Sequence, residues 1–140
     1  MKKIDLFRIT SYLALVGVGL AIYLLYEYLA PAHKSVCYLS STINCEASTK
    51  GVLANTLGIP TALWGLTGYS VIFLAAIKKW KRVLLGMTTF GLLFCLRITI
   101  LELFVVKVIC PVCVLCQLIM IAEFGLAVLI LQLWRRNLRG

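Results

Sequence analysis

The chain has 140 residues, of which 62% are apolar and 14% are charged, with a net charge of +9 and a mean hydropathy of +1.01. A soluble domain of this length has too little interior to remove that much apolar surface from water, so the composition indicates an integral membrane protein. The positive charge does not indicate nucleic-acid binding. Most basic residues form short clusters beside apolar stretches, where they act as topology signals and contact lipid headgroups.

Four apolar stretches are long enough to cross a hydrocarbon core of about 30 Å, which takes roughly 20 residues of helix. They run from about Ile9 to Leu29, from Pro60 to Ile77, from Val83 to Val106 and from Pro111 to Trp134. The first stretch lacks a small-residue cleavage site, so we expect a retained helix rather than a signal peptide. The sequence thus predicts an all-α membrane protein, a four-transmembrane-helix bundle that forms a single domain over residues 1–140.

The distribution of Lys and Arg predicts the orientation of the bundle. Basic residues gather at the N-terminus, in the connection 78–82 and in the C-terminal tail, whereas the connections 30–59 and 107–110 are poor in them. The positive-inside rule then places both termini in the cytoplasm, in a multi-pass protein of the cell membrane. The loop 30–59 faces the extracytoplasmic side.

The outer loop is expected to cover the bundle with a short capping helix. Residues Glu46 to Leu57 have an amphipathic pattern, and Gly58 suits the C-cap of a helix. Pro60 suits the first turn of the next span.

The six cysteines carry the most informative pattern, and they are Cys37, Cys45, Cys95, Cys110, Cys113 and Cys116. Cys37 and Cys45 lie in the outer loop, and Cys110 and Cys113 lie where the fourth span begins at the same face. Four cysteines therefore gather on the side of a membrane where disulfides persist.

The segment Cys110-Pro111-Val112-Cys113 is a CxxC motif at the N-terminus of a predicted helix. Free N–H groups and the positive helix end favour a thiolate there, and we expect Cys113 to be stabilised in this way. The pattern favours a redox-active dithiol, although CxxC also occurs in zinc sites. The loop pair, Cys37 and Cys45, fits either a structural disulfide or a relay by thiol–disulfide exchange.

The remaining cysteines have other interpretations. Cys116 lies one turn deeper in the helix than Cys113 and is expected to be a small buried apolar residue, as is Cys95. The spacing of Cys110, Cys113 and Cys116 is also compatible with iron–sulfur or other metal ligation. No metal is expected.

Arg97, Glu102 and Glu123 lie within the predicted spans, where charges usually have a partner or a function. Glu123 is expected to meet Arg97 across the bundle, either as a tether or as part of a proton relay. Glu102 is expected near the outer interface, where a charge has little energetic cost.

A quinone pocket is suggested by two kinds of residue. Gln117 lies on the same helix face as Cys113, so its side chain suits a hydrogen bond to a quinone carbonyl or a tie between helices. The aromatic residues Trp64, Phe94 and Phe104 either line an apolar pocket or belong to the core.

The arrangement resembles the vitamin K epoxide reductase family. The matching segments are Asn44-Cys45-Glu46, Leu57-Gly58-Ile59-Pro60 with Gly65 and Gly68-Tyr69 beyond, and Ile109-Cys110-Pro111-Val112-Cys113. The resemblance covers nearly the whole chain. It implies a four-helix bundle around a quinone of the menaquinone, ubiquinone or vitamin K type.

The resemblance also implies a direction for the electrons. Cys113 would face the quinone, Cys110 would accept electrons from Cys45, and Cys37 would be the more exposed loop cysteine. Prokaryotic relatives use such exchanges to form disulfides in exported proteins. The chain ends at Gly140 without a fused thioredoxin-like domain, so the expected partner is a separate thioredoxin-like, DsbA-like protein.

Three other functions fit parts of the pattern. A DsbB-type thiol oxidase has similar chemistry, but its CxxC lies in the first outer loop rather than before the last helix. A membrane metal-binding or assembly protein would use Cys110, Cys113 and Cys116 as ligands. A purely structural four-span subunit would have no use for the outer cysteines.

Overall fold

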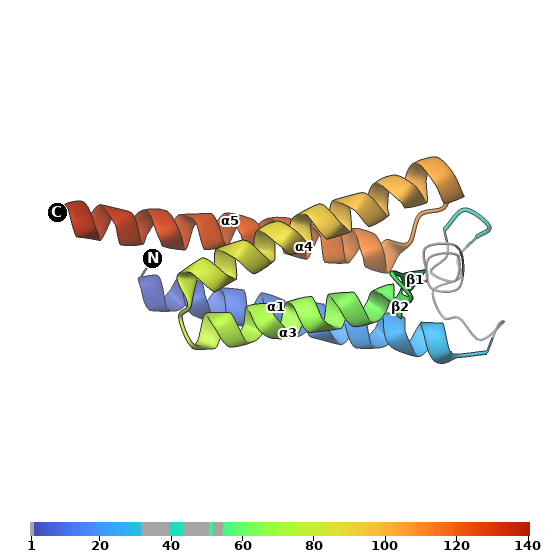
Figure 1. Ribbon diagram of the computed structural model, residues 1–140, viewed down its shortest axis with the longest axis horizontal. Helices are drawn as coiled ribbons and strands as arrows, with labels where there is room; N and C mark the ends of the chain where they lie inside the picture. Colours follow the sequence, from blue (N-terminus) through green and yellow to red (C-terminus); the bar gives the residue numbers. More distant parts are fainter. Residues whose placement is uncertain (1, 32–39, 44–50, 52–54) are drawn as a thin grey trace.

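The computed structural model describes residues 2–31, 40–43, 51 and 55–140, and it confirms the all-α membrane bundle. The elements in chain order are α1 (Lys3–Leu29), β1 (Asn55–Thr56), β2 (Ile59–Pro60), α3 (Thr61–Ile77), α4 (Lys81–Leu101), the π-helix η1 (Glu102–Val106) and α5 (Pro111–Arg139) (Figure 1). Each predicted span overlaps one long helix. The last helix continues to Arg139, five residues beyond the predicted end at Trp134.

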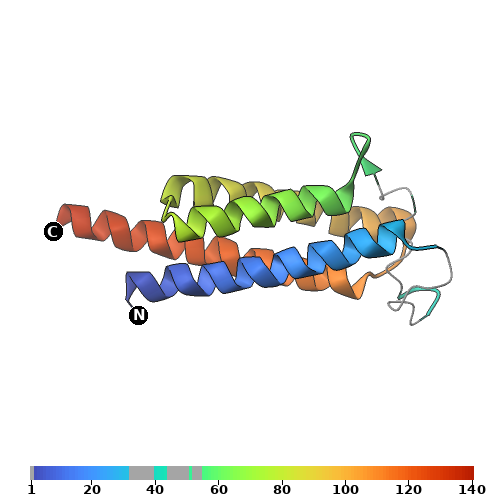
Figure 2. The ribbon, with the colours of Figure 1, turned by 90° about the horizontal axis from the view of Figure 1, so that it is seen from below.

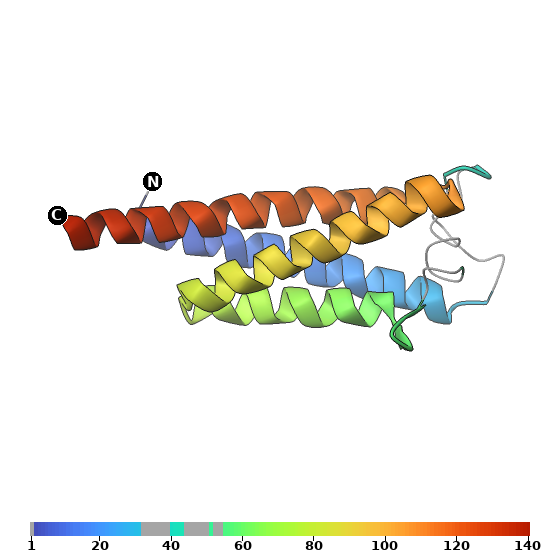
Figure 3. The same cartoon turned by 45° about the horizontal axis from the view of Figure 1, so that its top comes forward.

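The four long helices form a closed bundle. Helix α1 packs against α3 and α5, and α4 packs against the same two helices. Figures 2 and 3 show α5 running along both α1 and α4. Helices α1 and α5, and α4 with η1, are long and apolar enough to cross a membrane. Helix α3 is apolar but has only 17 residues, which is about the shortest length that crosses a hydrocarbon core.

The outer surface of the bundle is apolar. Large exposed side chains include Leu15 and Val16 of α1, Leu93 and Leu96 of α4, and Leu118 and Ile121 of α5. Apolar surface of this extent needs lipid rather than water as its solvent. The surface therefore agrees with an integral membrane protein.

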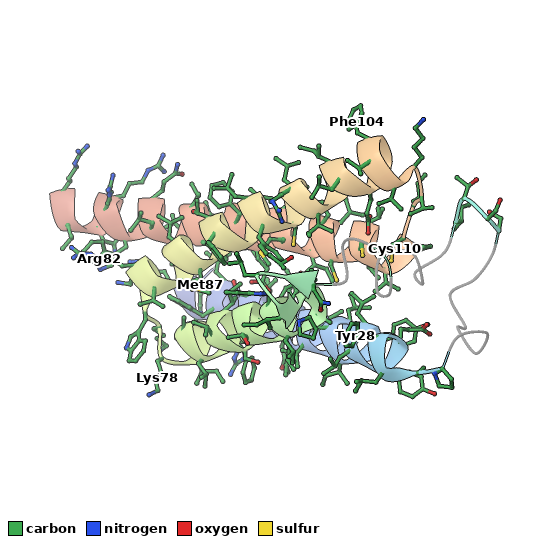
Figure 4. All side chains as sticks on the ribbon, turned by 45° about the vertical axis from the view of Figure 1, so that its right-hand side comes forward. Tyr28, Lys78, Arg82, Met87, Phe104 and Cys110 are labelled. Atoms are coloured by element: carbon green, nitrogen blue, oxygen red, sulfur yellow. The ribbon has the colours of Figure 1, made fainter. Side chains whose placement is uncertain are left out.

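The basic clusters all lie at one end of the bundle. Both termini and the turn between α3 and α4 lie at that end (Figure 1), and Figure 4 shows Lys78 and Arg82 far from Cys110. The Lys81 ammonium lies 4.3 Å from the ring centroid of Trp134, a cation–π contact between α4 and α5. The connection 78–82 and the C-terminal tail therefore lie at the same end of the bundle, as the predicted orientation in the membrane requires.

The segment before α3 is a hairpin and not the end of a helix. Of the predicted helix 46–57, residues 46–50 and 52–54 lie outside the described residues, but Asn55 and Thr56 pair with Pro60 and Ile59. Leu57 and Gly58 both have positive φ, 56° and 80°, which suits a two-residue hairpin turn.

The prediction that Gly58 caps a helix is therefore wrong. Pro60 ends β2 and is the N-cap of α3, one residue before the predicted position in the first turn. The indole N–H of Trp64 donates to the Thr56 carbonyl at 3.1 Å and holds the hairpin against α3.

A close approach between α1 and α3 depends on Gly17. A Cβ at this position would collide with the ring of Tyr69, which is only 2% exposed. We expect Gly17→Ala to lower the free energy of unfolding by about 1–3 kcal/mol, because the ring is too enclosed to move aside. Thermal unfolding in detergent tests this, with Gly19→Ala as the control, because no atom lies within 4 Å of a Cβ there. Equal stability of both variants would contradict the packing argument.

Candidate redox site

The CxxC motif begins helix α5. Cys110 is the N-cap residue, Pro111 occupies the first turn, and the Cys113 N–H donates to the Cys110 Sγ at 3.4 Å. An N-cap side chain that accepts a free N–H is the usual way to begin a helix, and a sulfur takes that role here. Cys110 is fully buried, so this contact is shielded from water.

The helix end therefore stabilises the sulfur of Cys110. Hydrogen bonds from the Cys113 side chain and backbone lower the pKa of Cys110 and outweigh burial, which raises it. The expectation that the helix end stabilises Cys113 is wrong in this respect. The reason is geometric, because the N-cap side chain turns back onto the N–H three residues later, whereas Cys113 is that N–H donor.

The lowered pKa has a measurable consequence. In the reduced protein, alkylation of Cys110 by iodoacetamide should continue below about pH 8.5, the ordinary thiol pKa, and fall as the pH drops through the lowered value. Cys113→Ala removes the largest stabilising contact, so the alkylation midpoint of Cys110 should move to higher pH. Mass spectrometry of the Cys110 peptide measures both midpoints, with Cys95→Ala as the control. An unchanged midpoint in Cys113→Ala would contradict the role of the hydrogen bond.

Glu102 approaches the same two sulfurs from the end of α4. The Glu102 carboxylate and the Sγ atoms of Cys110 and Cys113 all lie within 4.8 Å of one another, and Glu102 hydrogen-bonds the Cys113 side chain. Glu102 is only 2% exposed. Glu102 lies at the outer end of α4, but its burial makes the expectation of little energetic cost wrong.

Helix α4 reaches this position through a change of backbone. Glu102 begins the π-helical turn, which ends where Lys107 takes a left-handed conformation at φ 56° and Val108 N–H donates to the Glu102 carbonyl at 3.2 Å. Single π-helical turns inside α-helices are frequent at functional sites. The local sequence carries no marker for this turn.

A second buried carboxylate is linked to the motif through a tyrosine. Glu27 of α1 is 1% exposed and accepts a hydrogen bond from the Tyr23 hydroxyl at 3.0 Å, and Tyr23 interacts electrostatically with Cys110. Sequence reasoning missed Glu27. The available signal was an acidic residue within the last turn of an apolar span.

An apolar cavity of about 90 Å³ lies beside Cys113. All four long helices line it, with Ala21, Leu24 and Tyr28 from α1, Thr61, Ala62, Gly65 and Tyr69 from α3, Phe94, Cys95, Ile98 and Thr99 from α4, and Cys113 and Cys116 from α5. The Tyr69 hydroxyl donates to the Cys116 carbonyl at 2.9 Å across this wall. Cys113 thus faces the cavity, whereas Cys110 is not among its described lining residues.

Only some of the residues predicted for a pocket take part in it. Phe94 lines the cavity, and the Trp64 ring packs on Phe94 at a centroid distance of 6.3 Å. Phe104 is 76% exposed and points away from the bundle (Figure 4), so its predicted place in a pocket is wrong. Gln117 is not among the described lining residues, and its buried Oε1 has no hydrogen-bond partner in the described part of the chain.

The predicted contact between Glu123 and Arg97 is wrong. Glu123 is fully buried, and neither carboxylate oxygen has a hydrogen-bond partner among the described residues. Arg97 lies on the exposed face of α4. Residues on neighbouring helices meet only if both face the interface, and the sequence does not fix how α4 is rotated.

The chemistry of the cavity fits a quinone better than the sulfur cluster fits a metal. An almost wholly apolar wall with one redox thiol suits a flat apolar ring. The close group of possible ligands contains Cys110, Cys113 and Glu102 rather than the predicted Cys116. Three donors are one fewer than a closed zinc site takes, so the described residues do not complete one.

The described part of the outer loop lies next to the motif. Ile109 N–H donates to the Thr42 carbonyl at 2.7 Å, and Ile43 pairs with Ile109 as a parallel bridge. This anchor holds residues 40–43 beside the residue that precedes Cys110. Cys37 and Cys45, on either side of that segment in the sequence, lie outside the described residues.

Comparison with known families gives one finding. The model of the vitamin K epoxide reductase family matches residues 8–128, which include the CxxC motif and most of all four long helices. No curated protein matches the chain.

Proposed function

Because the chain belongs to the vitamin K epoxide reductase family, a family of membrane oxidoreductases, we propose that it links thiol oxidation to a quinone. Electrons pass from a separate thioredoxin-like, DsbA-like protein through Cys37 and Cys45 to Cys110 and Cys113, and then to the quinone. The observation that carries this proposal is the division of the CxxC pair. Cys113 lines the apolar cavity, while Cys110 follows the residue that anchors the loop.

The oxidation of the pair is a balanced two-electron step. The S–H bonds of Cys110 and Cys113 break, one S–S bond forms between the two sulfurs, and two protons and two electrons leave. A bound quinone, of the menaquinone, ubiquinone or vitamin K type, supplies the acceptor for those electrons and protons. Its ring would contact Cys113 and the apolar wall, and Gln117, one turn after Cys113, is proposed as a polar contact.

The loop returns the pair to the dithiol by exchange. A thiolate of Cys45 attacks the Cys110 sulfur of the disulfide, and Cys37 then displaces Cys110 to close the loop disulfide. The proposed role of Cys45 is supported by its position in the sequence, two residues after Ile43, which pairs with Ile109 next to Cys110. The partner protein then reduces the loop disulfide.

The proposed location of this exchange is the extracytoplasmic face of the cell membrane. The end that carries the basic clusters faces the cytoplasm by the positive-inside rule, and the CxxC motif lies at the opposite end. Substrates of the partner are then exported proteins that acquire disulfides.

The test is quinone reduction by the purified protein in lipid nanodiscs, followed by absorbance, with a reduced thioredoxin-like protein as the electron donor. The proposal expects turnover that requires both the protein and the donor. Folded protein that reduces no menaquinone, ubiquinone or vitamin K quinone would contradict it. The reduced thioredoxin-like protein with quinone but without the membrane protein serves as the blank.

A further inference from the structure

Glu102 is a buried carboxylate that lies beside the redox pair. Its side chain is only 2% exposed. A charged group at membrane depth is energetically costly, and such groups are usually paired or functional. The groups that the structure places beside it are the thiols of Cys110 and Cys113. A π-helical turn begins at Glu102, so the backbone of α4 departs from regular helix where the carboxylate meets the motif.

The two sulfurs do not have the same environment. Cys110 accepts the N–H of the helix end at 3.4 Å, which favours its thiolate. The Cys113 side chain approaches both the Cys110 sulfur and Glu102, so its single S–H proton has two possible acceptors. Because the Cys110 sulfur itself forms the S–S bond, it cannot keep this proton, and the Glu102 carboxylate is the acceptor that remains. Each sulfur of the pair thus has its own means of losing a proton.

We propose that Glu102 is the catalytic base that removes the thiol proton of Cys113 when the Cys110–Cys113 disulfide forms. The inference deepens the proposed function and rests on the redox role of the pair. The S–H bond of Cys113 breaks, its proton goes to a Glu102 carboxylate oxygen, and the sulfur forms the S–S bond with Cys110. The two electrons go to the oxidant, which is a quinone in the proposed reaction.

Other titratable groups also approach the site. On α5 these are Cys110 and Cys113 themselves, and on α1 they are Tyr23 and Glu27, with Tyr23 close enough to interact with Cys110. Glu27 is bonded to Tyr23, whereas Glu102 bonds directly to a reacting thiol. Of the two described carboxylates, Glu102 is therefore the one that the geometry selects.

The kinetic test uses diamide as the oxidant, so that it does not depend on a quinone. Reduced protein in nanodiscs is oxidised, and formation of the Cys110–Cys113 disulfide is followed by mass spectrometry. Glu102→Gln keeps the size of the side chain without the base, and should slow the reaction on the order of 100-fold at neutral pH. The defect should shrink as the pH rises, because hydroxide then removes the proton.

Two further variants make the comparison specific. Glu102→Asp restores a carboxylate one methylene shorter and should recover part of the rate. Glu123→Gln removes the charge of another fully buried glutamate of the bundle and should oxidise as the wild type does. Thermal unfolding of each variant identifies any loss of fold, and Glu102→Asp then carries the test if Glu102→Gln is unfolded.

Infrared difference spectroscopy gives a readout without turnover. On oxidation of the pair, a carboxylic acid C=O band should appear in the wild type and in Glu123→Gln but not in Glu102→Gln. A band that survives in Glu102→Gln, or equal oxidation rates for that variant and the wild type, would overturn the inference. Wild type that reduces no quinone, with Glu102→Gln still slow in diamide, would reject the proposed function and leave the base assigned.

Discussion

Cys113→Ala is expected to abolish quinone reduction. Cys113 is the only residue of the CxxC pair that lines the apolar cavity, so its sulfur is the one that a bound ring meets. Without Cys113, the remaining Cys110 cannot form the disulfide of the CxxC pair. Turnover with a thioredoxin-like donor should fall at least about 1,000-fold, the scale of effect that removal of a reacting group produces. Steady-state quinone reduction in nanodiscs measures it.

Cys116→Ala is the matched control for this prediction. Cys116 lies one turn further along α5 and lines the same cavity, but it is not one of the two cysteines at the start of the helix. Its variant should keep most of the activity. A loop disulfide formed chemically in Cys113→Ala should still oxidise one equivalent of the partner. Turnover that survives in Cys113→Ala would reject the assignment of the CxxC pair.

Cys45→Ala should block the delivery of electrons through the loop without affecting quinone reduction at the cavity. With a thioredoxin-like protein as donor, turnover should fall on the order of 100-fold, because a thiol on a short tether acts at an effective concentration near millimolar. With dithiothreitol, which is small enough to reach the Cys110–Cys113 disulfide directly, activity should stay near that of the wild type. The ratio of the two rates measures the contribution of the loop.

Cys37→Ala should show the same split between donors, since both loop cysteines are needed for a loop disulfide. Cys95→Ala, a cysteine of α4 that lines the cavity but takes no part in the exchange, should leave the ratio of the two rates unchanged. If Cys45→Ala lost the same activity with dithiothreitol as with the protein donor, Cys45 would act at the CxxC pair itself. Full activity with the protein donor would mean that the partner reaches Cys110 without the loop.

Several features of the fold were predictable because they depend on the bilayer. A membrane helix must be long and apolar, so hydropathy located the ends of α1, α3, α4 and α5 to within six residues. The gathering of the basic clusters at one end also follows from the order of the spans. The hairpin at Asn55–Pro60 was not predictable as such, because a short amphipathic pattern followed by glycine suits a helix end equally well.

The candidate site was predictable in part. The CxxC motif at a helix start was visible in the spacing, and so was its position at the end opposite the basic clusters. The helix-end hydrogen bond to Cys110 rather than Cys113 depends on the side-chain conformation of the N-cap. The failed pairing of Glu123 with Arg97 depends on the rotation of α4, which helical periodicity in an almost uniformly apolar span does not specify.

The sequence by itself determined that this protein is a membrane bundle with a redox-type cysteine motif, because span length, charge clusters and cysteine spacing are local properties of the chain. Only the tertiary structure decided which groups meet. It brought Glu102 from the end of α4 to the CxxC motif of α5, together with Tyr23 of α1, to which Glu27 is bonded, and it turned Cys113 rather than Cys110 toward the cavity. The physical reason is that the rotation of each helix, the π-helical turn at Glu102 and the packing of four helices depend on contacts between segments far apart in the sequence.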